Sequence, residues 1–253
     1  PRATVKQVYD QIIQDLTEAI PALPEAHGSG NDNVARATQD AARGLLSRVY
    51  LYKRDYANAA LLAEQVISSN RHQLNSSAYA EFRVPAGSVP SFTSESIFFI
   101  AQSLVGNDNP NTNAAIGQFY APNTSITVTP YRNALPSTDR RRVDLIISRQ
   151  SKYYTRKYTG ELPSGAPGGS NLGAWIPIVR YPEILLNRAE ALARTTGVTA
   201  EAVALLNQVR DRSKPASAAS YTVASFANAQ ALANAILTER RFELAFEGHR
   251  LYD

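Results

Sequence analysis

Cysteine and methionine are both absent from this 253-residue chain. The lack of thiols excludes a disulfide scaffold, a thiolate zinc site and a cysteine nucleophile. The three histidines, His27, His72 and His249, are far apart in the sequence, and no zincin, nucleophile-elbow, P-loop or dinucleotide pattern occurs in the required context. We therefore expect a protein that is not an enzyme and has no catalytic residues, metal or cofactor.

Long apolar runs and strong charge are also missing. No hydrophobic stretch approaches the length of a membrane span. Charged residues make up 19% of the chain and the formal net charge is +4, which is too small to indicate a nucleic-acid partner. The basic run Arg140-Arg141-Arg142 is followed by Asp144, and we interpret it as a solvated loop or helix start. The hydrophobic content of 44% is enough for a substantial core.

A first helix is predicted from Thr4 to Ile20, because Thr4 and Gln7 fit a capping box and Pro21 follows as a helix terminator. Its apolar positions recur at steps of three and four residues: Val5, Val8, Ile12, Leu16 and Ala19. The glycine-containing stretch 25–33 is predicted to be a loop.

Two helices follow, from Thr38 to Lys53 and from Tyr56 to Ser68, and their very short connection requires antiparallel packing. Their spacing is typical of a tetratricopeptide repeat: Leu46, Ser47, Tyr50, Ala59, Ala63 and Val66 occupy the expected positions. The predicted inward positions also include Ala42, Leu45, Val49 and Leu62.

A similar pair recurs near the end of the chain, with Thr199 as N-cap of its second helix and a tight turn at Gly197. Its inward positions are Leu185, Ala189, Leu192, Ala202, Leu206 and Val209. Two such pairs predict an all-α fold of tetratricopeptide-like helix pairs. One pair cannot bury its apolar face alone, so further pairs are expected.

The region 70–174 between the pairs is different, because it is rich in polar residues, glycine and proline. Its apolar segment Ile97 to Ala101 is either a strand or a short helix. Loops of this length in a compact domain are usually functional or disordered. We predict one helical domain over 1–253, with 70–174 as an irregular ligand-binding region inside it.

The last helix is predicted from Phe226 to Glu247, ended by Gly248. Glu239, Glu243 and Glu247 would then lie on one face, where like charges repel. Arginines are the best partners for buried carboxylates. We therefore predict a partly buried ion network that joins these glutamates to arginines elsewhere in the chain; the candidates are Arg180, Arg188, Arg210 and Arg240.

Both ends of the chain resemble the SusD/RagB family of outer-membrane nutrient-binding lipoproteins. The helical segment VYDQIIQDLTEAI and the first helix pair fit the family, and Asp139-Arg140 matches a step often found mid-chain. The most specific features lie near the C-terminus: Arg180-Tyr181 with Glu183, Ala189-Glu190-Ala191, and the run from Glu239-Arg240-Arg241 to Glu247-Gly248-His249-Arg250.

The resemblance implies a lipid-anchored protein on the cell surface that covers a SusC-like TonB-dependent outer-membrane transporter. Such a protein captures oligosaccharide, or in some members peptide, and delivers it to the pore. The lipidated cysteine of the family is not in this sequence. Since the chain runs from Pro1 to Asp253, within a motif, we expect both ends to be boundaries of a longer protein.

Sugar binding needs flat aromatic faces and short polar side chains, and the middle region contains both. We select Tyr120, Tyr131, Arg132 and Asn111 as candidate ligand-binding residues. The competing interpretation is that each tyrosine anchors its own loop. Trp175, the only tryptophan, is expected to be structural because a packed segment follows it.

Two other functions remain open. An intracellular tetratricopeptide scaffold for a protein partner would keep its repeats contiguous, whereas here more than 80 residues separate the pairs. An all-helical glycoside hydrolase would need two carboxylates that meet in the fold. Glu239, Glu243 and Glu247 could supply them, but their alternation with apolar residues favours the structural network.

Overall fold

The computed structural model describes residues 2–28, 30–82, 92–101, 116–120, 126–158 and 174–249. The helices, in chain order, are α1 (Val5–Ala22), α2 (Asn31–Ala35), α3 (Gln39–Tyr52), α4 (Tyr56–Ser68), the 3-10 turn η1 (Ala80–Phe82), α6 (Ile116–Tyr120), α7 (Thr129–Ala134), α8 (Arg141–Asp144), α9 (Tyr181–Thr195), α10 (Ala200–Asp211), the 3-10 turn η4 (Val223–Ser225) and α11 (Ala229–Glu243). The strands are β1 (Ser96–Ile100), β2 (Ile146–Arg149), β3 (Lys152–Thr155) and β4 (Ile176–Arg180).

Side-chain caps start the long helices where the sequence predicts. The main-chain amide of Ala41 donates to Thr38 Oγ1 at 3.2 Å, and that of Ala202 donates to Thr199 Oγ1 at 3.2 Å. These bonds satisfy amides that have no partner inside the helix. The two antiparallel helix pairs, α3 with α4 and α9 with α10, are confirmed, and with them the all-α tetratricopeptide-like fold class.

Helix α1 begins at the predicted capping box, since the amide of Gln7 donates to Thr4 Oγ1 at 3.2 Å. One detail of its prediction is wrong: Pro21 lies inside the last turn, so the helix continues to Ala22. Helix α1 packs against α3, but it has no buried residue, and Val5 is 74% exposed.

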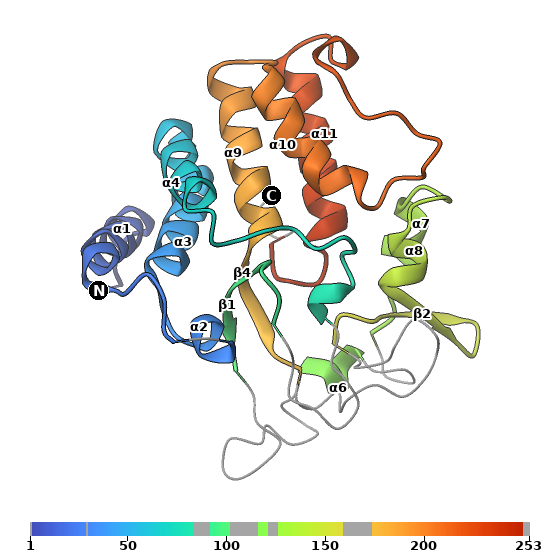
Figure 1. Ribbon diagram of the computed structural model, residues 1–253, viewed down its shortest axis with the longest axis horizontal. Helices are drawn as coiled ribbons and strands as arrows, with labels where there is room; N and C mark the ends of the chain where they lie inside the picture. The colour runs from blue at the N-terminus through green and yellow to red at the C-terminus, as the bar shows by residue number, and fades with distance from the viewer. Residues whose placement is uncertain are drawn as a thin grey trace.

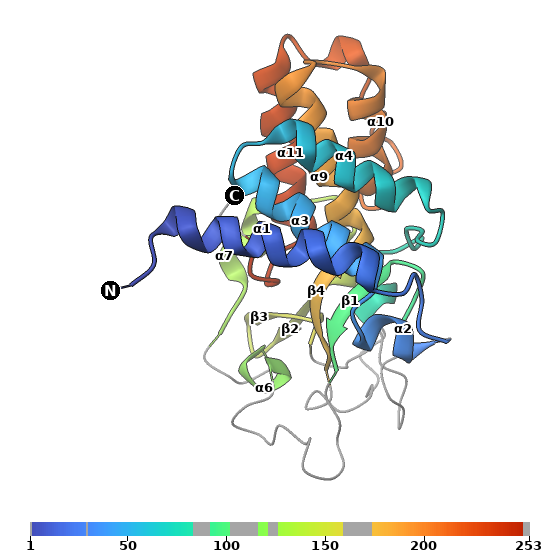
Figure 2. The same cartoon turned by 90° about the vertical axis from the view of Figure 1, so that its left-hand side faces the viewer.

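The helices form two groups that meet along α9 (Figure 1). One group contains α9, α10 and α11, and the other contains α3 and α4, with α1 crossing outside α3 (Figure 2). Most side chains of α9 are buried, and Ile184, Leu185 and Ala189 form part of the main core. None of the described helices is long and apolar enough to cross a membrane.

Close packing also requires a glycine in α3. A Cβ atom on Gly44 would lie 2.8 Å from Val179 Cγ1 and 3.0 Å from Ile184 Cδ1. This position therefore lets α3 approach the end of β4 and the start of α9.

Two small antiparallel sheets lie within or beside the region 70–174. Strand β1 pairs with β4, with Ser96 opposite Arg180, so the two ends of the region come together. The segment Ile97 to Ala101, for which a strand or a helix was expected, contributes to a strand. Strands β2 and β3 form a hairpin whose two turn residues, Gln150 and Ser151, have positive φ.

Helix α11 is shorter than predicted at both ends. It begins after Asn228, whose Oδ1 accepts the amide of Ala231 at 2.9 Å, and it ends at Glu243. The chain then turns, with positive φ at Phe246 and Gly248. Glu247 therefore lies in this turn and does not share a helix face with Glu243, as the sequence analysis had assumed.

Candidate functional site

Arg180 is the centre of a buried charge network. It ends β4, precedes α9 and is 1% exposed. Its Nη1 donates to Glu95 Oε1 at 2.6 Å, and its Nε donates to Glu247 Oε2 at 2.8 Å. Glu243 Oε1 lies 3.3 Å from Nη1. Burial acts to lower the pKa of Arg180, but the surrounding carboxylates raise it well above its usual value, so Arg180 stays charged.

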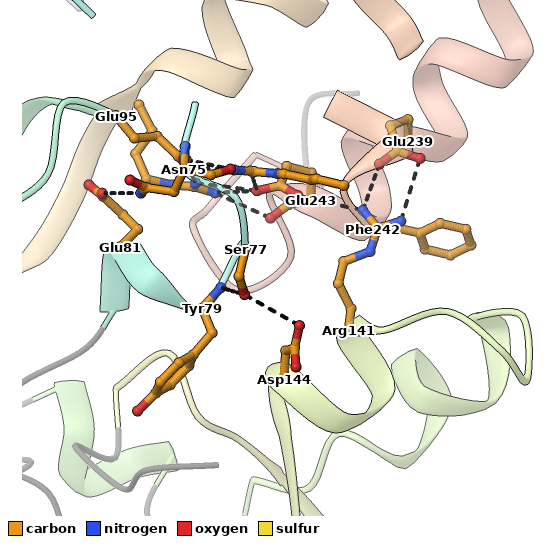
Figure 3. A network of polar contacts seen from close by, with 12 residues as sticks. Asn75, Ser77, Tyr79, Glu81, Glu95, Arg141, Asp144, Glu239, Phe242 and Glu243 are labelled. Carbon is orange, nitrogen blue, oxygen red and sulfur yellow. Dashed lines mark hydrogen bonds and ion pairs between the residues drawn. The ribbon is translucent and has the colours of Figure 1, made fainter. Parts of the chain in front are cut away.

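Two further arginines extend the network, Arg141 (Figure 3) and Arg212. Arg141 Nη1 donates to Glu239 Oε1 at 2.6 Å, and Arg141 Nη2 donates to Asp139 Oδ2 at 2.8 Å. Arg212 donates to Glu95 Oε2 at 2.6 Å and to Glu243 Oε1 at 2.7 Å. The basic run does lie at a helix start, that of α8, but it is not solvated at Arg141, which is only 1% exposed.

Lys157 adds a fourth cation to the network. Its Nζ donates to the carbonyl oxygen of Glu243 at 2.7 Å and also to the Glu247 carboxylate. Burial lowers the pKa of Lys157, while Arg180 and Lys157 hold the pKa of Glu247 below its usual value against the opposing effect of burial. The network thus ties the end of β3 and the segments at 95 and 139–141 to the helical core.

The structure brings together only some of the predicted network residues. Glu243 and Glu247 both contact Arg180, and Glu239 joins through Arg141. Arg188 lies elsewhere: it pairs with Glu64 at 3.1 Å and Glu201 at 2.5 Å, both partly exposed.

Two other predicted arginines also point away from the network. Arg240 donates to Asn187 Oδ1 at 2.6 Å. Arg210 pairs with Asp211 and lies 4.0 Å from the centre of the Tyr221 ring. The sequence analysis missed five members that contribute to the network: Glu95, Asp139, Arg141, Lys157 and Arg212.

A separate pair fixes the start of α9. Arg48 Nε donates to Glu183 Oε1 at 2.5 Å, which joins α3 to α9. Burial acts to raise the pKa of Glu183, but Arg48 and His249 lower it to about 2. His249 Nδ1 lies 3.9 Å from Glu183 Oε1, and burial lowers the pKa of this imidazole. These contacts agree with a structural role for His249.

Glu81 is the unusual carboxyl group beside the network (Figure 3). It is 4% exposed and accepts hydrogen bonds from the hydroxyl groups of Thr93 and Ser96. Asn75 Nδ2 lies 3.4 Å from Glu81 Oε2, while the main-chain amide of Asn75 donates to Glu95 Oε2. Burial, together with the charge of Glu95, raises the pKa of Glu81 to about 8. Glu81 is therefore predominantly a neutral acid at pH 7.

Tyr120 and Tyr131, two of the candidate ligand-binding residues, have different environments. Tyr120 is partly exposed at the end of α6, and its ring centre lies 5.5 Å from that of Tyr158 and 5.7 Å from that of Phe246. Tyr131 is buried, and its hydroxyl donates to the carbonyl oxygen of Phe242 at 2.8 Å. Tyr131 therefore anchors α7 to α11, which is the alternative role considered for it, and we no longer regard it as a ligand contact.

Arg132 is partly exposed, and its guanidinium carbon lies 4.1 Å from the centre of the Tyr153 ring. Tyr153 and Phe246 pack against the same buried cluster, which includes Tyr131. The groups around Arg132 and Tyr120 are therefore both supported by this cluster. Asn111 lies outside the described residues.

Glu239, Glu243 and Glu247, the carboxylates considered for hydrolysis, lie in the ion network. Glu239, Glu243 and Glu247 have side chains that are at most 6% exposed, and each pairs with an arginine or lysine. A substrate could not reach them without breaking these ion pairs. Within the described ranges, no group of three histidine, aspartate or glutamate side chains is placed to hold a metal ion.

Comparisons with known proteins agree with this architecture. Residues 95–253 match the family model described as "SusD family", and residues 1–51 match one described as "Starch-binding associating with outer membrane". The chain is 29% identical over 287 residues to a SusD-like protein, P2, of Formosa agariphila, covering 98% of this chain and 55% of that relative.

Solved structures give the same result. A SusD superfamily protein of Bacteroides fragilis superposes with a TM-score of 0.78 at 28% identity, covering 100% of this chain and 55% of the other. A SusD superfamily protein of Bacteroides thetaiotaomicron superposes with a TM-score of 0.77 at 26% identity, covering 99% of this chain and 55% of the other. The chain thus spans about half the length of these relatives. Because the family model matches well over half of the chain, this chain belongs to the SusD family.

Proposed function

We propose that this chain is part of a non-catalytic protein that captures oligosaccharides at the cell surface. The observation that carries the proposal is the family match over residues 95–253, supported by the match of residues 1–51 to a model described as starch-binding. The burial and pairing of Glu239, Glu243 and Glu247 support a binding role, because these groups are held in the interior of the molecule.

The ligand contacts belong, in this proposal, to the irregular region between the helix pairs. The partly exposed ring of Tyr120 offers an apolar face to the C–H side of a sugar. Arg132, stacked on Tyr153, supplies donors for hydroxyl groups. Asn111 stays a candidate as an amide that can both donate and accept.

The site of action in this proposal is the outer membrane, where a lipid anchor outside this chain would hold the protein against a SusC-like TonB-dependent transporter. The description "associating with outer membrane" of the matched model supports this location. Co-purification of the complete protein from detergent-solubilised outer membranes tests it. We expect a TonB-dependent receptor in stoichiometric amounts, and recovery of the protein alone in the soluble fraction would contradict the proposal.

Binding is tested by calorimetry of the complete protein against malto-oligosaccharides and other plant, host and microbial oligosaccharides, with product analysis of the same samples. We expect saturable binding of one glycan class without breakdown. Binding of peptides alone, or of no ligand, would contradict glycan capture. Release of shorter sugars would contradict a non-catalytic role.

The contact residues are tested by substitution. Tyr120→Ala should weaken binding by about 0.5–1.5 kcal/mol, while Tyr120→Phe keeps the ring and should retain it. Arg132→Ala should weaken binding by a similar amount through lost hydrogen bonds, about 0.5–1.5 kcal/mol. Tyr9→Ala, on the surface helix α1, is the matched control for removal of a ring.

A further inference from the structure

A pocket of about 410 Å³ lies between α2 and the segment 92–97. Its volume falls within the range of about 300–1,000 Å³ that is usual for small-molecule sites. It contains none of the residues that the sequence analysis selected. Six of the residues that line it carry the argument: Glu25, Asn33, Thr38, Arg71, Phe92 and Ser94.

The charges in this pocket are already paired. Arg71 donates through Nε and Nη2 to the two oxygens of Asp40 at 2.8 and 2.9 Å, and through Nη1 to Glu25 at 3.2 Å. His72 Nε2 lies 3.3 Å from Asp40. Burial acts to raise the pKa of Asp40, but His72 and Arg71 hold it well below its usual value. The carboxylate therefore stays charged at neutral pH and neutralises Arg71, which leaves little net charge for an anionic ligand.

One wall of the pocket is aromatic. Phe92 is partly exposed, and its ring centre lies 4.4 Å from that of Trp175 and 5.0 Å from that of Phe99. These contacts fix the orientation of the Phe92 ring. A fixed ring at the edge of a polar pocket suits the C–H face of a sugar.

The remaining walls carry short polar side chains on supported backbone. The hydroxyl groups of Thr93 and Ser96 both donate to the buried Glu81, which fixes the turn between them. Ser94, within that turn, is exposed. Asn33 on α2 and Thr38 at the start of α3 line the pocket as well. Each of these groups already makes an internal bond: Asn33 Oδ1 accepts the main-chain amide of His27, Thr38 Oγ1 accepts that of Ala41, and the Ser94 hydroxyl donates to the carbonyl oxygen of Gln73. The Thr38 hydroxyl hydrogen, one amide hydrogen of Asn33 and the lone pairs of Ser94 Oγ are left for a ligand.

We infer that this pocket is a subsite for an uncharged sugar unit of the captured oligosaccharide. The ring of Phe92 packs against the C–H face of the sugar. The hydroxyl groups of the sugar accept hydrogen bonds from Thr38 and Asn33 and donate to Ser94. The inference rests on the proposed glycan-binding function and adds a second contact region to the one around Tyr120. It also specifies the ligand class: neutral sugars are preferred to uronates.

The test fills the pocket without disturbing the core. Ser94→Trp places a large side chain at an exposed position of the pocket wall and should lower the affinity for neutral oligosaccharides by at least about tenfold, by blocking the site. Ser94→Ala leaves the space open and removes one hydroxyl, so we expect a loss of at most about tenfold. Phe92→Ala should lower the affinity for neutral oligosaccharides by about two- to tenfold, because the ring face is lost. Ser217→Trp, at an exposed position between α10 and α11, is the matched control and should bind like the native protein.

Calorimetry of the complete protein measures these affinities with maltoheptaose, laminarihexaose, xylohexaose and, as the acidic probe, oligogalacturonate. The inference is supported if Ser94→Trp loses affinity for the neutral probe that the native protein binds, while its melting temperature and that of Ser217→Trp stay native. It is overturned, with the proposed function intact, if Ser94→Trp binds that probe as tightly as the native protein, or if oligogalacturonate alone binds in a salt-dependent manner. Failure of the native protein to bind any glycan would overturn the proposed function itself.

Discussion

The hydroxyl group of Tyr131 donates to the main-chain oxygen of Phe242 at 2.8 Å across 111 residues of sequence. This bond joins a short helix of the irregular region to the last turn of α11. Phe242 also packs in the same cluster as Tyr131. The contact explains how a segment with little regular structure keeps a fixed position on the helical core.

Replacement of this hydroxyl should affect stability and leave binding unchanged. Tyr131→Phe keeps the ring and leaves the buried carbonyl oxygen of Phe242 without its partner, so we expect a loss of about 1–3 kcal/mol in the free energy of unfolding. Urea denaturation measures this loss. A large drop in glycan affinity at native stability would show instead that Tyr131 contacts ligand.

Removal of Arg180 from the buried network should lower the free energy of unfolding far more than removal of Arg188, which lies outside it. Arg180→Met removes the cation that the buried carboxylates of Glu95, Glu243 and Glu247 share, and it should cost about 3–5 kcal/mol. Arg188→Met, whose partners Glu64 and Glu201 are about half exposed, should cost less than about 1 kcal/mol. Thermal and urea unfolding of the two variants test the difference. Equal losses would mean that the buried network contributes no more than a surface pair.

Glu81 should make stability depend on pH in a direction opposite to that of most acids. Burial and the charge of Glu95 raise its pKa from the ordinary value of 4.5 to about 8 in the folded chain, so the folded state binds more protons between these values. Stability attributable to Glu81 is therefore fully present below pH 4.5 and is lost as the pH rises toward 8, with a slope of up to about 1.4 kcal/mol per pH unit.

Glu81→Gln removes this dependence while it keeps a neutral polar group. Relative to the native protein, the variant should gain stability from pH 5 to pH 8, by at least about 2 kcal/mol. Urea denaturation at pH 5, 6.5 and 8 measures the gain, and the exposed Glu18→Gln controls for loss of a surface charge. A stability difference that is constant over this pH range would show that Glu81 is ionised throughout.

The contact at Gly44 should not tolerate one additional carbon atom. Alanine is favoured over glycine in a helix by about 1 kcal/mol. At this position, however, the new Cβ would meet Val179 at 2.8 Å, so we expect Gly44→Ala to destabilise the chain by a net amount of about 1–3 kcal/mol. The double variant with Val179→Ala should lose less free energy of unfolding than the two single variants lose together, because the contacting methyl group is gone. Strict additivity would contradict the steric explanation.

Local signals in the sequence predicted the helix pairs well. Thr38 and Thr199 are caps whose partners lie three residues away, and the apolar periodicity of α4 gave the buried positions Ala59, Ala63 and Val66. The early end of α11 was missed because no helix-breaking residue stands directly after Glu243. Beyond that end, Glu247 meets Arg180, 67 residues away.

Partners in the network could not be found in the same way. Arg141 meets Glu239 across 98 residues, and Arg212 meets Glu95 across 117. Nothing in the sequence distinguishes a buried arginine from an exposed one. The run that contains Arg141 was therefore interpreted as exposed to solvent. The pocket beside α2 was missed for a related reason: its walls come from three separate segments that only the fold brings together.

The position of Arg180 between β4 and α9 has a consequence for how the molecule unfolds. Charges from the segments at 95, 141, 157, 212 and 243 neutralise one another in one interior site, so none of these segments can detach without leaving uncompensated charge behind. The two halves of the chain should therefore unfold together.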